Sequence, residues 1–264
     1  MPGGRSAASL AIGRDLMKHS RCHIRGVLAL IALVCCGPVA AAEVEADASL
    51  RATAEATLAR IAPNLAIDAV RPAPMPGLIE VEAAGQLLYL SADGRHLLQG
   101  NLIDTIERVD LSERRRQHNR SEVLQTLDPT QAIAFPAVEE RHRVTVFTAL
   151  ECGYCKRFHA DIEAYRAAGI SIDYVLIPMR GEGSEGDLAG ARVHCAADRQ
   201  DAFTRATAGE RIEGPMCDSG YDAGKALAAR LGIRNTPTIV RVDGSTSGYQ
   251  SPAELSASLA ALTR

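Results

Sequence analysis

The sequence predicts a two-domain protein of mixed α+β and α/β class. Three observations predict it: a strand–helix–strand series in the middle of the chain, a set of short strands with turn signals before it, and a charged, glycine-free helix between the two. The length of 264 residues is enough for one large domain or two small ones. The net charge of −3 and the apolar fraction of 47% are ordinary, so composition indicates neither a nucleic-acid partner nor an acidic ligand.

The N-terminus carries an export pattern. Basic residues precede a short apolar run from Val27 to Cys36, and the small-residue sequence GPVAAA follows. This order is typical of a secretory signal peptide. We predict cleavage after Ala42, so that residues 1–42 form the signal peptide, with Met17 as an alternative start.

A membrane-spanning anchor and a lipid-modified cysteine are the two alternatives to a cleaved signal peptide. The apolar run is shorter than the roughly 20 residues that a spanning anchor needs, so no membrane anchor is expected. A lipid on Cys35 or Cys36 is the second alternative, but the preceding Val34 and Cys35 are not the small residues that such processing needs. The mature protein then keeps four cysteines, an even number that suggests disulfides in an exported chain.

Residues 43–108 are predicted to form a small α+β domain. Helical spacing of apolar residues runs from Ala46 to Ile61, and Pro63 stops it. Short strands follow, and Asp93-Gly94 between apolar runs is a hairpin turn signal. The last strand, RHLLQGNL, has no obvious partner in the sequence, so it is either a covered edge within one monomer or an edge that pairs with another chain.

Residues 109–137 are predicted to be a linker region with an exposed helix at about 111–127. The basic run Arg114, Arg115 and Arg116 could bind an anionic partner, but a solvated helix face is the simpler interpretation.

The second domain is predicted to span 138–264. The strand RVTVFTAL, a helix after Cys152 that ends at Gly169, and the strand ISIDYVLIP form a βαβ unit with parallel strands. Residues from about 182 to 231 are mostly helical, with glycine breaks. The segment TPTIVRVDGSTSGY reads as two strands joined at Asp243-Gly244. A final helix starts with Ser251 as N-cap.

The chemistry lies in the segment ECGYCKRFH. Cys152 and Cys155 could be a haem attachment point, half of a metal site, a structural disulfide or a redox couple. Haem attachment needs a histidine directly after the second cysteine, where this chain has Lys156. A zinc site needs four ligands, and only His159 is available as a third, so no metal is expected.

The redox interpretation fits the position after a strand. Cys152 falls at a helix N-terminus, where unpaired N–H groups stabilise a thiolate and lower the thiol pKa. Cys155 lies one turn inward and is expected to be more buried. Lys156, Arg157 and His159 are expected to add positive potential, whereas the carboxylate of Glu151 opposes it.

Cys195 and Cys217 are then the predicted structural disulfide, which would contribute about 3 kcal/mol for a loop of this length. Two free buried thiols are the alternative. The Thr236–Pro237 bond, taken alone, is expected to be trans, as most X-Pro bonds are.

Together, VTVFTALECGYCKRFH, the Cys195/Cys217 pair, GIRNTPTIV and DGSTSGYQSPAEL resemble the DsbC/DsbG family of periplasmic disulfide isomerases. RPAPMPGLIEV and LLYLSADGRHLLQGNLID extend the resemblance over nearly all of the mature chain. CGYC is typical of the DsbC members, whereas the DsbG members usually have proline after the first cysteine. This chain departs from the family in Glu151, where threonine is usual, and in His194, where tryptophan is frequent.

The resemblance implies a cystatin-like dimerisation domain, a linker helix and a thioredoxin-like domain with a helical insertion. It implies a homodimer that pairs through RHLLQGNL, that is His96, Leu97, Leu98, Gln99 and Gly100, and that holds unfolded exported proteins in an apolar cleft. Pro237 would be a cis-proline facing the cysteines. Gly153, Tyr154, Thr236 and Pro237 would bind substrate.

We therefore predict a periplasmic thiol-disulfide isomerase with no cofactor. Cys152 is the predicted nucleophile and Cys155 the resolving thiol, kept reduced by a membrane thiol reductant like DsbD. Alternatives are a dedicated reductase, for example of sulfenic acids or of one client, and a chaperone-like holdase that works without thiol chemistry. A monomeric oxidant would leave the domain at 43–108 without a task.

Overall fold

The computed structural model describes residues 38–262, with side chains from Asp47 onward. Most of the predicted signal peptide, including Cys35 and Cys36, lies outside the described residues. The predicted cleavage point after Ala42 falls inside the first helix, α1 (Pro38–Ile61). Within 38–262 no helix combines the length and the apolar character that crossing a membrane requires.

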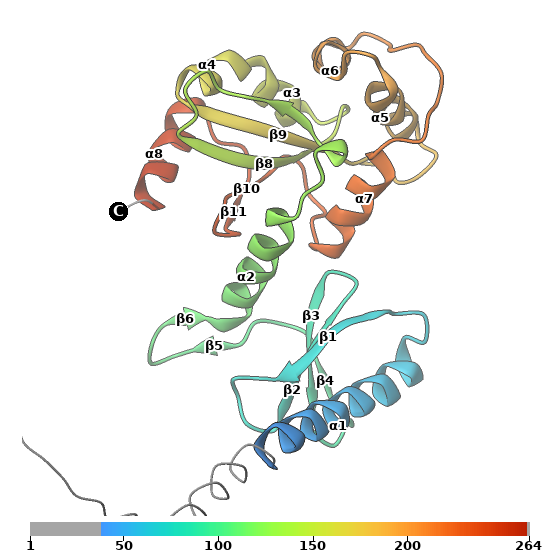
Figure 1. Cartoon of the computed structure of the whole chain (residues 1–264), viewed down its shortest axis with the longest axis vertical. Helices are drawn as coiled ribbons and strands as arrows, with labels where there is room; N and C mark the ends of the chain where they lie inside the picture. Colours follow the sequence, from blue (N-terminus) through green and yellow to red (C-terminus); the bar gives the residue numbers. More distant parts are fainter. Residues whose placement is uncertain (1–37, 263–264) are drawn as a thin grey trace, which may run out of the picture. The chain divides into compact units, whose positions relative to one another are not determined.

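The N-terminal part is a four-stranded antiparallel sheet in the order β1-β2-β3-β4, with α1 lying across it (Figure 1). The strands are β1 (Ile67–Pro72), β2 (Leu78–Ala83), β3 (Gln86–Ser91) and β4 (Leu97–Leu98). A separate two-stranded sheet follows, formed by β5 (Ile103–Asp104) and β6 (Val109–Asp110). This confirms the α+β prediction.

The core of this part forms between the apolar face of α1 and one face of the sheet. Ala54 and Leu58 of α1 pack against Ile79, Val81 and Leu90, and all five side chains are at most 2% exposed. Buried and exposed side chains do not alternate strictly along β2 and β3, because several residues on the other face of these strands are buried too.

Two turns connect β2, β3 and β4. The predicted Asp93-Gly94 turn joins β3 to β4, and Asp93 accepts hydrogen bonds from the Ser91 hydroxyl and the Arg95 N–H. The turn between β2 and β3 is Ala84-Gly85, with φ of 46° and 71°, the left-handed pair that a tight hairpin requires. No Asn-Gly or Asp-Gly pair marks this turn in the sequence.

Helix α2 (Leu111–Gln125) is the predicted linker helix. Asp110 caps its first turn by accepting a hydrogen bond from the Glu113 N–H at 2.8 Å. The expectation that its basic run is a solvated face is only partly right. Arg114 is exposed, but Arg115 pairs with the buried carboxylate of Glu80 at 2.9 Å, which balances a charge that could not stay buried alone.

The C-terminal part has a five-stranded sheet in the order β11-β10-β8-β9-β7. Its strands are β7 (Ile133–Phe135), β8 (His142–Thr148), β9 (Ile170–Leu176), β10 (Thr238–Val240) and β11 (Thr246–Ser247). β8 and β9 are parallel, as predicted, and the other pairs are antiparallel. β7 pairs with β9, so this sheet includes residues ahead of the predicted domain start at Val138.

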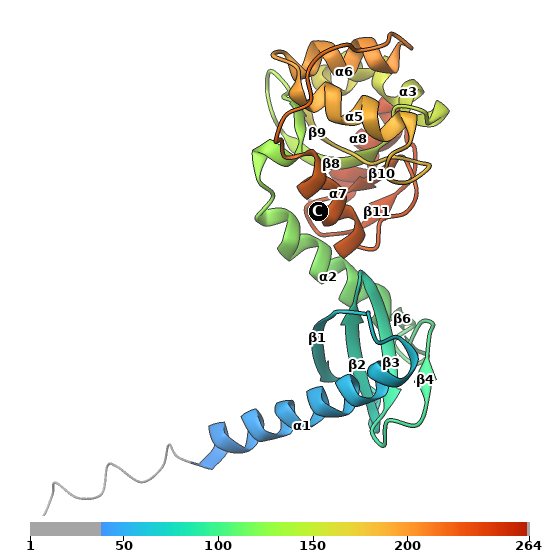
Figure 2. The same cartoon turned by 90° about the vertical axis from the view of Figure 1, so that its right-hand side faces the viewer.

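Helices cover both faces of this sheet (Figures 1 and 2). They are α3 (Gly153–Ala160), α4 (Ile162–Ala167), α5 (Glu185–Cys195), α6 (Arg199–Thr207), α7 (Tyr221–Arg230) and α8 (Pro252–Leu262), with a short 3₁₀ turn at Pro129–Gln131. On one face Phe158 and Tyr165 pack with Leu255 of α8. On the other, Leu227 of α7 packs against Phe147 and Val175.

The predicted helical insertion is present as α5, α6 and α7, with an irregular segment from 208 to 220 between α6 and α7. Val193 of α5 and Phe203 of α6 enter the same core as the helix that follows Cys152. The insertion is therefore part of the domain core and is not an appended lobe.

Candidate active site

Cys152 lies at the point where β8 turns into α3. β8 ends at Thr148, and Cys152 is the N-cap of α3, with its Sγ accepting a hydrogen bond from the Cys155 N–H at 3.3 Å. The sulfur thus takes the place that a serine or aspartate oxygen usually holds at a cap. Cys152 is 6% exposed, so only a small part of its surface is open to solvent.

The surroundings of Cys152 lower its thiol pKa. Burial alone would raise this pKa, but hydrogen bonds from Cys155 and Thr236 and from the backbone N–H groups of Cys155 and Tyr154 outweigh it and hold the thiolate. The direction agrees with the prediction from the helix N-terminus. Thiolate is the attacking form of a cysteine, and of the two thiols only that of Cys152 has a lowered pKa.

Cys155 is the buried member, with 1% exposure. Burial is the first cause that raises the pKa of its thiol to about 11, and the neighbouring Cys152 sulfur adds to it. At neutral pH Cys155 is therefore a thiol and Cys152 is the one poised to ionise. The pKa values of the two thiols are therefore shifted in opposite directions.

The Thr236–Pro237 bond is cis. The trans geometry expected from X-Pro bonds in general is wrong here, and the cis geometry implied by the family resemblance is the one present. The antiparallel register of Thr238 with Phe147 brings this bond beside the end of β8. As a result the Thr236 carbonyl oxygen lies 3.3 Å from the Cys152 Sγ.

The surface around Cys152 is open on the side of Gly153. A Cβ placed on Gly153 would meet nothing within 4 Å, and the next residue, Tyr154, is 62% exposed. The Tyr154 ring lies 5.9 Å from the ring of Tyr249, which in turn is covered by the Arg157 guanidinium. Gly153 therefore borders open space, and the exposed ring of Tyr154 lies beside it.

His159 does not contribute the positive potential expected of it. It is 4% exposed, and burial lowers its pKa to about 4, so the ring is neutral at pH 7. Thr204 donates its hydroxyl hydrogen to the Gln200 carbonyl. The His159 Nε2–H therefore donates to Thr204 at 3.0 Å, and its Nδ1 accepts from the Tyr174 hydroxyl at 3.3 Å.

These partners also account for His159 as a core residue. Thr204 and Tyr174 come from α6 and β9, and their closeness to His159 has no sequence signal, because it arises only when the insertion packs on the sheet.

Within 38–262 no group of three or more histidine, cysteine or acidic side chains could hold a metal ion.

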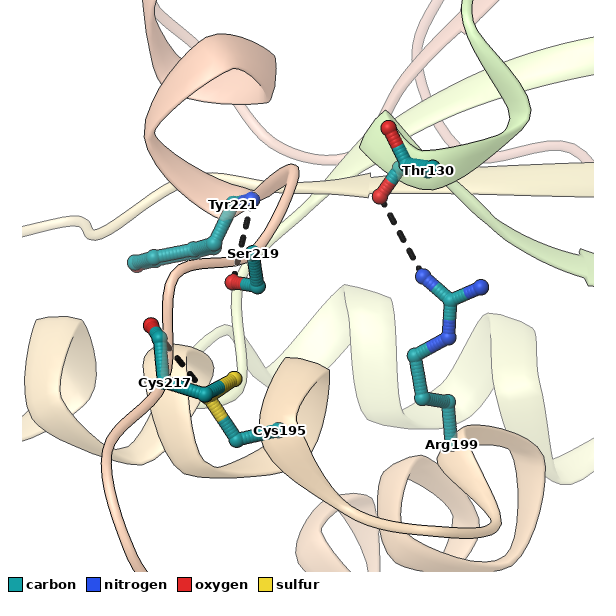
Figure 3. The surroundings of a disulfide bond; sticks show 6 residues. All are labelled: Thr130, Cys195, Arg199, Cys217, Ser219 and Tyr221. Carbon is teal, nitrogen blue, oxygen red and sulfur yellow. Dashed lines mark hydrogen bonds between the residues drawn. A yellow bond between two sulfur atoms is a disulfide. The ribbon is translucent and has the colours of Figure 1, made fainter.

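Cys195 and Cys217 form a disulfide (Figure 3). It joins the last residue of α5 to the irregular segment before α7, and Cys217 is exposed. Nearby, Arg199 donates to the Thr130 carbonyl at 3.2 Å, which ties this region to the 3₁₀ turn ahead of β7. The Tyr221 N–H donates to the Ser219 hydroxyl at 3.4 Å at the start of α7. The disulfide thus holds two parts of the insertion together, whereas the cysteines of CGYC are free thiols.

His194, beside this disulfide, is buried without a hydrogen-bond partner for either ring nitrogen among the described residues. Burial is the first cause that lowers its pKa to about 4, and the Arg199 charge adds to it. Its ring lies 5.3 Å from that of Tyr221, so it fills an apolar position where the family frequently has tryptophan.

The residues predicted for dimerisation lie at the edge of the N-terminal sheet. β4 pairs with β3 on one side only, and Leu97 and Leu98 are 45% and 51% exposed. His96 and Gln99 are fixed locally by hydrogen bonds to Ser91 and Gln86. A Cβ on Gly100 would meet nothing within 4 Å, so the chain itself leaves that side open.

Known families match both parts of the chain. Residues 39–113 match the disulfide bond isomerase protein N-terminal domain, and residues 130–263 match a thioredoxin-like domain. The thiol:disulfide interchange protein DsbC of Dickeya dadantii is 35% identical to this chain over 72% of it and 79% of the relative. The chain belongs to the DsbC family.

A second relative agrees with this assignment. DsbC of Escherichia coli K12 is 31% identical, over 70% of this chain and 78% of the relative. Among solved structures, a disulfide interchange protein from Neisseria gonorrhoeae is 23% identical with a TM-score of 0.45, over 50% of this chain and 95% of that one. As a DsbC-family protein with a thioredoxin-like domain, the chain is a thiol-disulfide oxidoreductase whose function is disulfide isomerisation.

Proposed function

We propose that Cys152 is the nucleophile and Cys155 the resolving thiol of this isomerase. The observation that carries the proposal is the position of Cys152 as the N-cap of α3, with its sulfur held by the Cys155 N–H at 3.3 Å. The pKa of Cys152 is lowered and that of Cys155 is about 11, so only Cys152 offers a thiolate at neutral pH.

The reaction exchanges sulfur–sulfur bonds without a cofactor. The Cys152 thiolate attacks one sulfur of a client disulfide, forms a mixed disulfide and releases the other client sulfur as a thiolate. A client thiolate then attacks the client sulfur of the mixed disulfide, which forms the new client disulfide and returns Cys152 as a thiolate. This route is redox-neutral.

The second route ends in reduction. Cys155 loses its proton and attacks the Cys152 sulfur, the client leaves as a thiol, and Cys152 and Cys155 are left as a disulfide. Two electrons from a thiol reductant are then needed to restore the pair. We assign this task to a membrane reductant like DsbD. The high pKa of Cys155 favours the first route, because it keeps the resolving thiolate scarce.

We further propose that clients are misoxidised exported proteins in extended conformation, bound across Gly153, Tyr154, Thr236 and Pro237. The cis bond places the Thr236 backbone beside Cys152, which suits strand-like pairing with a client backbone. The open space over Gly153 leaves room for that backbone. The export pattern at the N-terminus supports a periplasmic location for the reaction.

A homodimer through β4 is the proposed assembly. Leu97 and Leu98 are exposed apolar residues on an unpaired strand edge, an arrangement that soluble monomers rarely leave uncovered. We expect residues 43–264 to sediment as a dimer and Leu98→Arg to sediment as a monomer. Ile106→Arg, at a residue that is 89% exposed but outside β4, is the matched control and should stay dimeric. A monomeric unmodified chain would contradict the proposal.

The decisive test is recovery of a model protein with scrambled disulfides, using residues 43–264 in a glutathione buffer. We expect recovery that is lost in Cys152→Ala and partly kept in Cys155→Ala, because the redox-neutral route does not need Cys155. Equal recovery by Cys152→Ala would overturn the assignment of the nucleophile. Efficient reduction of small disulfides or sulfenic acids without recovery would instead identify a dedicated reductase.

A further inference from the structure

The carboxylate of Glu151 lies directly against the backbone of Gly186. A Cβ built on Gly186 would fall 1.6 Å from the Glu151 Oε1, 2.1 Å from its Cδ and 2.6 Å from its Oε2. The carboxylate therefore fills the space that any side chain at position 186 would need. Gly186 is a buried residue in the first turn of α5, whose N-cap is Ser184.

This contact joins the reactive loop to the insertion. Glu151 directly precedes Cys152, the N-cap of α3, so its carboxylate is one residue away from the group that must ionise. A carboxylate near a thiol raises the thiol pKa. It would also compete for the positive end of α3, where the Cys155 N–H already holds the Cys152 sulfur.

The first turn of α5 offers the carboxylate another place. The leading N–H groups of a helix have no partner within it, and their dipoles favour a negative charge. Of these, the Asp187 N–H is bound by the Ser184 hydroxyl at 3.2 Å. Asp187 turns its own carboxylate to the Gly183 N–H, the Tyr221 hydroxyl and the Lys225 ammonium.

We propose that Gly186 is a positioning residue for the reaction: it leaves a seat on the first turn of α5 that holds the Glu151 carboxylate away from the N-terminus of α3, where the Cys152 thiolate forms. The proposal rests on Cys152 being the nucleophile. In this view the family departure at Glu151 is tolerated because Gly186 accommodates it. The pKa of Tyr221 in α7 is consistent with this position of the carboxylate. Burial and Asp187 are the main causes that raise it, and the Glu151 charge adds to them.

Several other charged groups surround the two ends of this contact. On the α5 and α7 side they are Glu185, Asp187, Asp222 and Lys225. On the α3 side they are Lys156 and Arg157, both exposed, and the Cys155 thiol. A test must therefore separate the Glu151 charge from these, and a cycle of two substitutions does so.

The experiment measures the rate of alkylation of Cys152 by iodoacetamide between pH 5 and pH 9 in the full mature chain, read by mass spectrometry. Gly186→Ala closes the seat and expels the carboxylate. We expect the apparent pKa of Cys152 to rise by about 0.5 to 1, because the charge then lies near the sulfur in a solvent-exposed setting. Glu151→Gln alone should change this pKa little, since the seat already holds the charge away from the N-terminus of α3.

The double variant Gly186→Ala with Glu151→Gln gives the sharpest outcome. It should return the Cys152 pKa to the value of the unmodified chain. Glu185→Gln, which removes a charge from the same turn of α5, is the matched control and should have no effect. Equal effects of Gly186→Ala with and without the Glu151 charge would overturn the proposal, as would a Gly186→Ala chain with an unchanged pKa.

A second variant guards against a folding defect in Gly186→Ala. Glu151→Asp shortens the side chain by one methylene, so its carboxylate cannot reach Gly186, and the same rise in the Cys152 pKa is expected. An unchanged pKa in Glu151→Asp would contradict the seat. Because alkylation reads the thiol itself, failure of this proposal is distinct from failure of the catalytic assignment, which shows as full isomerase activity in Cys152→Ala.

Discussion

The C-terminal part of the molecule contains two cysteine pairs that behave in opposite ways. Cys152 and Cys155 are three residues apart at the start of a helix, with free thiols of very different pKa. Cys195 and Cys217 are 22 residues apart and joined by a disulfide that fastens the insertion. The residue type is the same, so backbone setting decides between chemistry and stability: one sulfur caps a helix, the other crosses between two segments.

The largest expected effect is on reactivity. At pH 7, iodoacetamide should modify Cys152 at least about 100-fold faster than Cys155, because thiolate is the reactive form and the pKa of Cys155 is about 11 while that of Cys152 lies below the value of an ordinary thiol. Peptide mapping after a short exposure measures both rates. Cys195 and Cys217 should stay unmodified without reductant, and labelling there would break the distinction between the pairs.

The next effect is on stability. Replacing both Cys195 and Cys217 with alanine should lower the free energy of unfolding by about 3 kcal/mol, because the unfolded chain regains the entropy of the open loop. Urea unfolding followed by circular dichroism measures it. At low temperature, iodoacetamide should still modify Cys152 in this variant. A variant of full stability would mean that the disulfide is not structural, and loss of Cys152 reactivity in the folded state would mean that the pairs are coupled.

His194, next to the disulfide, should make the stability of the fold depend on pH. Its folded pKa of about 4 lies below the value of about 6.5 in an unfolded chain, so the fold favours the neutral ring. The stability this gives is complete above about pH 6.5 and is lost as the pH falls toward 4, by up to about 3 kcal/mol.

We therefore expect His194→Phe to lose less stability between pH 7 and pH 4 than the unmodified chain. Thermal unfolding at each pH measures the difference. His159, with the same lowered pKa, remains in both proteins and is the internal reference. Parallel curves for the two proteins would show that the His194 ring is not the acid-sensitive group.

The smallest effect concerns the two helix caps. Ser184 caps α5 through a hydrogen bond from the Asp187 N–H, and Ser184→Ala should destabilise the fold by about 1 kcal/mol. Cys152 caps α3 with a sulfur, a weaker acceptor, so Cys152→Ala should cost less stability while abolishing activity. Chemical unfolding of both variants checks the order, and a reversed order would assign Cys152 a structural task.

Sequence patterns were enough to predict the βαβ unit, the position of Cys152 at the start of a helix and the pairing of Cys195 with Cys217. The first two follow from local patterns, a β-branched strand and a CxxC before an amphipathic helix. The third follows because assigning Cys152 and Cys155 to redox chemistry leaves Cys195 and Cys217 as the remaining pair. The hairpin at Asp93-Gly94 and the helix after Ser251 were predictable for the same reason, since turn and cap residues act within a few positions of themselves.

The remaining features could not be predicted from local patterns, because they depend on contacts between segments that are distant in the chain. The neutral state of His159 requires burial by β9 and α6, and the ion pair of Arg115 in α2 requires Glu80 from β2. The cis bond at Pro237 sets the Thr236 carbonyl beside Cys152 across the β8–β10 register. The contact of Glu151 with Gly186 belongs here too: local spacing places a carboxylate next to the reactive sulfur, and only the packing of α5 gives it somewhere else to lie.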